Sequence, residues 1–229
     1  MRFVAGALAL VAVLAGCSQE SAPAPTSAVA EPRAAEPSAQ RPVEPAADAV
    51  PPAAPATDGR PRAARISIPS LGLRAMRVLP YTGTPDDGPG TAIQDDGDLA
   101  SPHGSGGLVG PGGIGNYLVT GHRSSSTQPF ADLPSLRPGA RVVVETGGQR
   151  LVYEIVRTDS TSFRSPASLR AQSAAVPGRP GRSATRSMMT LSTCATAEDH
   201  AAGNYWSDEF HNPEHRIEKI GVLRSVAPA

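Results

Sequence analysis

Short stretches of alternating apolar and polar residues, punctuated by Gly and Pro, fill the chain from about residue 63 onward. A period of two is typical of half-buried β-strands. We therefore predict strands at residues 65–68, 73–79, 116–120, 141–146, 150–157, 187–193 and 216–224. Helical periodicity is nearly absent, and only residues 130–136 and 165–171 predict single helical turns. Many short strands with Gly/Pro punctuation indicate a mainly β domain, a small barrel or a sandwich.

Two segments within this region predict exposed loops. Residues 81–115 are rich in Gly, Pro and Asp and carry no clear period, and residues 173–186 have a similar composition. In contrast, Gly147-Gly148 separates two strand patterns by two residues and predicts a β-hairpin turn.

The first 17 residues have a different pattern. A positive start, Met1-Arg2, precedes an apolar run over residues 3–15 that is short for a membrane-spanning helix. The run ends in Leu14-Ala15-Gly16-Cys17, which looks like a bacterial lipobox. We expect a lipoprotein signal peptide over residues 1–17 with lipidation at Cys17. An ordinary secretory signal with an unrelated cysteine, or a short uncleaved anchor, are the alternatives.

Residues 18–62 predict a Pro/Ala-rich disordered spacer, and residues 63–229 a single folded domain. Nine prolines spread through residues 23–55, each of which removes a backbone donor and fixes φ. Such a segment buries little and extends on the order of 3 Å per residue as polyproline II. The spacer would hold the domain away from the membrane, although a dispensable tail would have the same composition.

Net charge and cysteine content limit the classes of function that fit this chain. Formal net charge is zero, so nothing suggests a nucleic acid or an anionic membrane surface as partner. The chain contains two cysteines. If Cys17 is lipidated it cannot form a disulfide, and Cys194 is then a free thiol in an oxidising compartment. That context makes Cys194 a candidate nucleophile.

Three residues at predicted strand ends have the chemistry for acyl transfer. Cys194 ends one strand, His122 follows another, and Arg216 begins a third. A thiol attacks as the thiolate, an imidazole takes and returns the proton, and a fixed guanidinium stabilises the oxyanion. Arg suits the last role because it stays charged and its planar fork holds geometry. Arg123 and Arg224 are alternatives to Arg216, and each of the three residues alone is more often structural.

The motifs around these residues resemble those of sortases. Tyr117-Leu118-Val119-Thr120-Gly121-His122-Arg123 looks like the sortase strand that ends in Gly-His, and Thr190-Leu191-Ser192-Thr193-Cys194 like the Thr-Leu-x-Thr-Cys strand. Residues 66–73 are similar to the family's opening Ile-Pro-x-x-Gly segment, and residues 130–139 match the stretch after the His. The resemblance runs from about residue 66 to 223. The His-Arg pair and the Pro-Gly-x-x-Gly segment before it are most similar to actinobacterial class E sortases.

This resemblance implies a closed β-barrel of about eight strands with short helices and long loops. It also implies a cysteine transpeptidase that cleaves a Leu-(Pro or Ala)-x-Thr-Gly sorting signal through a thioester. The acceptor would be an amine of a peptidoglycan precursor or a pilin, and no cofactor or metal would be needed. The enzyme would sit at the outer face of the cytoplasmic membrane or in the cell wall, held by lipid. A thiol hydrolase of the same fold and a non-catalytic peptide-binding lipoprotein are the rival functions.

The segment between Cys194 and Arg216 is longer than the resemblance leads us to expect. It is rich in aromatic residues in a chain where aromatics make up 4%. We expect a lid or substrate wall, with a decorated surface loop as the alternative. Tyr205, Trp206 and the strand residue Thr193 are the candidate substrate contacts. Asp199, His200 and His211 lie in the same segment, but their spacing does not support a metal site.

Overall fold

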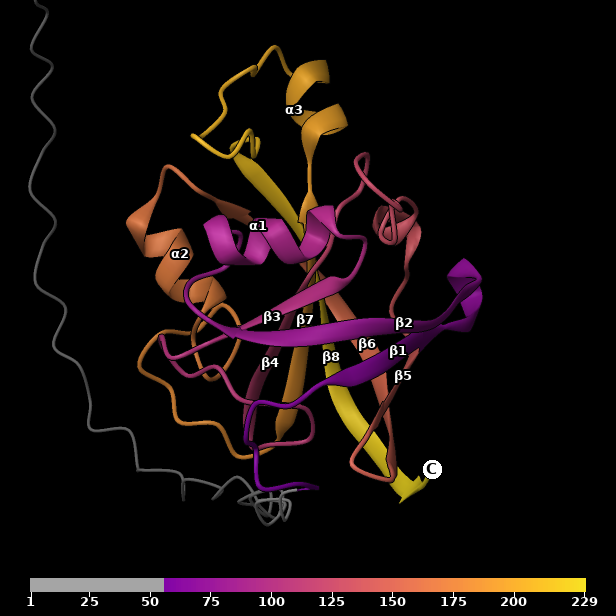
Figure 1. Cartoon of the computed structure of the whole chain (residues 1–229). Coiled ribbons are helices and arrows are strands. Elements are labelled where there is room, and N and C mark those ends of the chain that lie inside the picture. The colour runs from indigo at the N-terminus through magenta and orange to yellow at the C-terminus, as the bar shows by residue number, and fades with distance from the viewer. Residues whose placement is uncertain (1–55) are drawn as a thin grey trace, which may run out of the picture. The chain divides into compact units, whose positions relative to one another are not determined.

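Eight β-strands close into a barrel in this computed structural model, which describes residues 56–229 (Figure 1). Their order around the barrel is β1-β2-β3-β4-β7-β8-β6-β5. The strands are β1 (Ala64–Ile68), β2 (Leu73–Thr82), β3 (Leu99–His103), β4 (Gly115–Thr120), β5 (Arg141–Thr146), β6 (Gln149–Ser162), β7 (Ser187–Cys194) and β8 (His215–Pro228). The predicted mainly β, closed barrel of about eight strands is confirmed.

Helices are few and short. They are α1 (Gly88–Asp95), α2 (Pro166–Gln172), α3 (Thr196–Ala201) and two 3-10 turns, η1 (Pro69–Leu71) and η2 (Leu133–Ser135). Figure 1 shows α1, α2 and α3 toward one end of the barrel, away from the C-terminus. No helix among residues 56–229 is long and apolar enough to cross a membrane.

The barrel interior is filled by the apolar positions that the alternation predicts. In β5, for example, Val142 and Val144 are fully buried while Arg141 is exposed. The core gathers Ile66, Ile68, Val78, Leu99, Tyr117, Val119, Phe130, Leu133, Leu151, Tyr153, Ile155, Met189 and Leu191. β4 and β7 are the exceptions to alternation, because nearly every residue of both is buried. These two strands are covered on both faces, so their buried positions include polar residues such as Asn116, Thr190 and Ser192 as well as apolar ones.

The prediction that residues 81–115 form an exposed loop is wrong. This segment contains the end of β2, the whole of α1 and the whole of β3. β3 pairs in parallel with β2 over Val78–Thr82 and is buried along most of its length. Residues 173–186 contain neither helix nor strand, as predicted, and residues 178–183 are exposed.

Residues 1–55 are outside the described part of the chain, so the signal peptide, Cys17 and most of the spacer are not described by the structure. Residues 56–62 contact the barrel. The Thr57 hydroxyl donates to the Pro111 carbonyl at 2.6 Å, and the Gly110 amide donates to the Gly59 carbonyl at 2.7 Å. Ordered packing therefore begins before the first strand.

Candidate active site

Three neighbouring strands bring His122, Cys194 and Arg216 to one level of the barrel. β4 and β7 run parallel with Thr120 beside Ser192, and His122 and Cys194 each follow two residues later. β7 and β8 run antiparallel, and Cys194 is itself paired with Arg216. Neighbouring strands are about 4.8 Å apart. The backbone register therefore places Cys194 in the middle of a row, with His122 on one side and Arg216 on the other.

Gly121 lets the chain turn from β4 into His122. Its amide donates to the Ser192 carbonyl at 3.2 Å, which continues the β4–β7 ladder by one residue. A Cβ at this position would lie 2.4 Å from Leu99 Cδ2 and 2.8 Å from Phe130 Cδ2, both in fully buried side chains. The Gly of the Gly-His motif is thus required by close packing against β3.

Cys194 is a free thiol in a half-buried position. Burial raises the pKa of the Cys194 thiol, the positive charges of Arg216 and Arg123 lower it, the carboxylates of Asp86 and Asp208 raise it, and the net shift is upward. Two opposed sets of charges therefore surround the sulfur. The arginine paired with it across the sheet is the strongest influence that favours the thiolate.

His122 is held by an acid that the sequence did not suggest. Its Nε2 lies 2.8 Å from Asp95 Oδ1, at the C-terminal end of α1. The His122 side chain is only 13% exposed, whereas that of Asp95 is 63% exposed. The contact joins β4 to α1 at the rim of the site.

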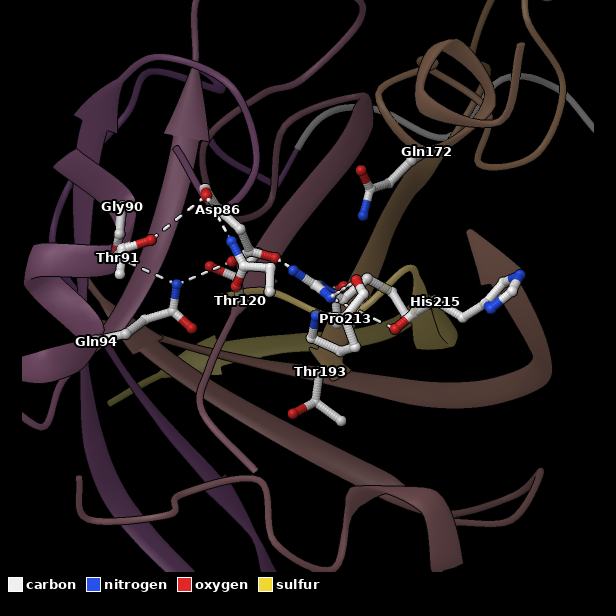
Figure 2. Close-up of polar contacts among 12 residues, drawn as sticks. Asp86, Gly90, Thr91, Gln94, Thr120, Gln172, Thr193, Pro213 and His215 are labelled. Carbon is white, nitrogen blue, oxygen red and sulfur yellow. Dashed lines mark hydrogen bonds and ion pairs between the residues drawn. The ribbon is translucent and has the colours of Figure 1, made fainter. Parts of the chain in front are cut away.

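Arg216 is fully buried and its guanidinium is bound on several sides (Figure 2). Nε donates to Asp86 Oδ2 at 2.8 Å, and Nη1 donates to the carbonyls of Pro213 at 3.0 Å and His215 at 3.4 Å. The guanidinium carbon also lies 4.0 Å from the centre of the Phe163 ring. Within residues 56–229, Nη2 is the one nitrogen of this group without a hydrogen-bond partner.

Charge on Arg216 is preserved despite its burial. Burial acts to lower the pKa of Arg216, but Asp86 and the Cys194 thiolate raise it, and the net shift is upward. The two alternative arginines are otherwise engaged. Arg123 donates to the Cys194 carbonyl at 3.3 Å and pairs with Glu198, and exposed Arg224 pairs with Glu154.

A cavity of about 940 Å³ lies next to the residues that contact Arg216, although Cys194, His122 and Arg216 themselves do not line it. Asp86 and Phe163, which both contact the guanidinium, line it, together with residues of α2, of 173–183 and of 208–210. Two buried polar atoms of lining residues, Ser105 Oγ and Gln172 Oε1, have no partner among the described residues. Such atoms can bond to the backbone of an extended peptide.

The candidate substrate contacts fall elsewhere. Thr193 is buried and donates to the Gly121 carbonyl at 2.7 Å, Trp206 is half-buried, and Tyr205 is 72% exposed with its ring stacked on His200 at 4.7 Å. None of these three lines the large cavity, whereas Phe210 from the same long segment does. That segment contains α3 and contributes Asp208, Glu209 and Phe210 to the cavity wall.

Sequence reasoning missed two acids that contact the catalytic row, Asp86 and Asp95, both in the segment predicted to be an exposed loop. It also missed a buried acid, Glu218, which lies on β8 two residues after Arg216. Gln172 Nε2 donates to Glu218 Oε1 at 2.6 Å, and Ser192 Oγ donates to the same atom at 3.2 Å. A signal for Glu218 was present, because it shares a strand face with Arg216 by the period of two. Within residues 56–229, no group of three or more His, Cys, Asp or Glu residues is placed to hold a metal ion.

Comparisons with known proteins agree with this fold. A family model described as the sortase domain matches residues 66–206. Three solved structures are similar. A sortase from Actinomyces oris has 16% sequence identity and a TM-score of 0.54, over 72% of this chain and 80% of that chain. Sortase E from Streptomyces avermitilis has 26% identity and a TM-score of 0.51, over 75% of this chain and 93% of that chain, and sortase E1 from Streptomyces coelicolor has 23% identity and a TM-score of 0.50, over 74% of this chain and 91% of that chain. A search of curated protein sequences found no match. Since the family model covers more than half of the chain, this protein belongs to the sortase family of cysteine transpeptidases.

Proposed function

We propose that the enzyme cleaves a sorting signal of the Leu-(Pro or Ala)-x-Thr-Gly type and transfers the resulting acyl group to an amine. The observation that carries the proposal is the row across β4, β7 and β8, in which Cys194 lies between His122 and Arg216. Nucleophile, acid–base and oxyanion donor occupy neighbouring strands, as acyl transfer requires.

In the first half-reaction, the enzyme starts with Cys194 as the thiolate and His122 holding the proton, and Cys194 Sγ attacks the carbonyl carbon of the substrate Thr. The unpartnered Nη2 of Arg216 stabilises the oxyanion that forms. The C–N bond to Gly then breaks, and His122 donates a proton to the departing amine. The Thr carbonyl remains on Cys194 as a thioester.

In the second half-reaction, an amine attacks the thioester and His122 accepts its proton. The C–S bond breaks and Cys194 leaves as the thiolate, so that the enzyme returns to its starting state. Water in place of the amine gives free acid, which is the hydrolase alternative. The amine of a peptidoglycan precursor or a pilin is the acceptor we propose.

The cavity beside Arg216 supports peptide binding. Its wall includes Asp86 and Phe163, which both contact the Arg216 guanidinium, and also Gln172 and Ser105, whose buried Oε1 and Oγ atoms have no partner among the described residues. The S. coelicolor sortase E1 structure was solved with a tripeptide in its active site. We propose that the residues of the sorting signal before the Thr occupy this cavity.

The test is intact-protein mass spectrometry after incubation with a panel of Leu-(Pro or Ala)-x-Thr-Gly peptides, with and without amines. Wild type should gain the mass of the acyl fragment, and Cys194→Ala should gain none and cleave no peptide. A good amine should divert the thioester to ligated product and speed turnover. Turnover indifferent to every amine, with free acid as the only product, would establish the hydrolase; cleavage by Cys194→Ala would refute the assignment.

Sortases act at the cell envelope, and we propose lipid as the anchor of this one. The motivation is Leu14-Ala15-Gly16-Cys17 at the end of a short apolar run. The mature chain would begin at Cys17, followed by the 18–62 spacer and the 63–229 domain. Two acyl chains suffice for stable attachment. Mass spectrometry of the mature N-terminus checks this: Cys17→Ala should release the protein or leave its signal uncleaved, and a lipid-free wild type starting at Met1 would contradict it.

A further inference from the structure

The helix α1 and its N-terminal flank touch both outer members of the catalytic row. Asp86, two residues before α1, binds Arg216, and Asp95, the last residue of α1, binds His122. With a rise of 1.5 Å per residue, the seven steps of α1 from Gly88 to Asp95 span roughly 10 Å. β4 and β8 are two strand spacings apart, about 10 Å. The helix therefore has the length needed to bridge the row, and Figure 1 shows it lying crosswise at this end of the barrel.

Asp86 adopts an unfavourable backbone conformation. Its backbone has φ of 58°, in the left-handed region that residues other than Gly rarely adopt. The Asn212 side chain donates to the Asp86 carbonyl at 3.2 Å, and the Thr91 hydroxyl donates to it at 3.4 Å. Strain of this kind persists only where the surroundings enforce it, and it gathers at functional sites.

The carboxylate of Asp86 is equally constrained. Oδ1 accepts from Gln94 Nε2 at 2.9 Å, while Oδ2 accepts from Arg216 Nε, and the three side chains are all buried (Figure 2). Gln94 lies on α1 and also donates to the Gly90 carbonyl at 3.2 Å. Helix α1 thus holds the side-chain amide of Gln94, and this amide in turn fixes the orientation of the Asp86 carboxylate.

Because Asp86 accepts a hydrogen bond from Nε of Arg216, only the other guanidinium nitrogens could donate to a substrate. Pro213 and His215 accept from Nη1 and the Phe163 ring covers one face, which leaves Nη2, a nitrogen buried from solvent, as the one without a hydrogen-bond partner among residues 56–229. If the Arg216 guanidinium rotated in its plane, a different nitrogen would face the substrate. Stabilisation of the oxyanion depends on where the donor lies.

We propose that Asp86 and Asp95 are positioning residues, and that α1 holds Arg216 and His122 in register on either side of Cys194. Asp86 fixes the plane of the Arg216 guanidinium so that Nη2 faces the reacting carbonyl. Asp95 fixes the ring of His122. The proposal rests on the proposed roles of these two residues in acyl transfer.

The first test is a double-mutant cycle with Asp86→Asn and Arg216→Lys, with peptide cleavage as the readout. Asn tolerates the left-handed backbone, so the loop keeps its shape. Asp86→Asn alone should lower kcat/KM by roughly 10- to 100-fold, mostly through kcat, as expected for loss of a hydrogen bond to a charged group. In the Arg216→Lys background the same change should have little further effect, because Asp86 acts through the guanidinium.

An equal loss in both backgrounds would show that Asp86 acts independently of Arg216 and would overturn the proposal. A rise in activity would also overturn it, since Asp86 would then be a brake that competes with substrate. Asp95→Asn should lower kcat by roughly two- to fivefold, the effect of an exposed pair. The neighbouring exposed Asp96→Asn, which has no side-chain partner among the described hydrogen bonds, is its matched control and should match wild type. Equal losses in the two variants would overturn the role of Asp95.

A second test needs no peptide, so it stands if the proposed substrate is wrong. Iodoacetamide alkylation of Cys194 is followed against pH in wild type and Asp86→Asn, which tolerates the left-handed backbone at this position. The charged groups that act on the thiol are Arg216, Asp86, Asp208 and Arg123, and Arg216 has the largest effect among them. If Asp86 holds Arg216, its loss releases the arginine and the alkylation midpoint rises. A midpoint that falls or stays would show that Asp86 is a mere neighbouring charge, and would overturn the proposal.

Discussion

The ends of β4, β7 and β8 and the connection between β2 and β3 both reach the active site, but different forces fix them. Backbone ladders set the strand ends, because pairing Cys194 with Arg216 follows from the antiparallel register. Side-chain contacts set the connection, because Asp86 and Asp95 reach the site through single carboxylates. Reactive groups thus lie on the rigid ladder, and the groups that orient them lie on a helix packed against it.

This division predicts where substitutions do most damage. A change in a strand-end side chain removes a reactive group, and a change in the connection alters only its orientation. The following predictions test that ranking, starting with the largest expected effect.

Arg216→Lys should cost about 2–4 kcal/mol of transition-state stabilisation, or roughly 30- to 1,000-fold in kcat, if Arg216 acts as an oxyanion donor. Lys keeps the charge but loses the fork that binds Asp86 and leaves Nη2 free. Steady-state kinetics with a cognate peptide measure this. A larger loss of kcat in Asp86→Asn than in Arg216→Lys, measured in parallel, would contradict the ranking of strand-end residues above the β2–β3 connection.

Glu218→Gln tests how a buried acid on β8, away from the reactive groups, affects the stability of the β7–β8 pair. Burial raises the pKa of Glu218 to about 7, although hydrogen bonds from Gln172 and Ser192 oppose the shift. The native state therefore keeps its proton between about pH 4.5 and 7, where the unfolded chain releases it. Stability from this group is fully present below that range and is lost as pH rises through about 7, a change of about 3 kcal/mol.

Urea unfolding at pH 5 and pH 8 measures this change. Wild type should lose stability between the two values, and the neutral Glu218→Gln variant should lose about 2–3 kcal/mol less, because a small part of the effect has already been lost at pH 5. An identical loss in wild type and variant would mean that Glu218 is ionised in the folded protein at pH 5. The conservative variant keeps an acceptor for Gln172, so packing is preserved.

The strand ends were predictable because their signals are local. Six of the seven predicted strands differ from the observed ones at their ends, and all seven exist. β5 is reproduced residue for residue, since its Val-rich alternation ends at the Gly147-Gly148 turn. The two central strands carry the Gly-His and Thr-Cys motifs, so the candidate nucleophile and its partners could be named.

The connection was missed because its signals are weak or non-local. α1 reads Gly-Pro-Gly-Thr-Ala-Ile-Gln-Asp, whose glycines and proline hide the helical period. A local signal did exist, because Asp87 caps the helix through the Gly90 amide and proline is favourable in the first turn. β3 has five residues and includes Pro102. Asp86 and Arg216 are 130 positions apart, a separation that no pattern in the sequence reports.

Gly121→Ala probes the point where the two regions touch. An added methyl would overlap Leu99 of β3 and Phe130, and overpacking in a filled core costs about 1–3 kcal/mol. The backbone should shift and carry His122 with it, so kcat should fall along with stability. Thermal unfolding and kinetics measure both. A variant with wild-type stability would mean that β3 yields easily, and that it does not constrain the Gly-His turn.

The smallest effect should come from the aromatic residues of the long segment between β7 and β8. Phe210 lines the cavity and is 38% exposed, whereas Tyr205 is 72% exposed and lies outside the cavity lining. If the sorting signal fills the cavity, Phe210→Ala should weaken its binding by about 1 kcal/mol of lost apolar contact, or about fivefold in KM, with kcat nearly unchanged. Tyr205→Ala is the matched control in the same segment and should leave KM within twofold. Peptide kinetics of the two variants beside thermal unfolding separate binding from folding. A larger KM for Tyr205→Ala than for Phe210→Ala would move the peptide out of the cavity and onto the outer face of this segment.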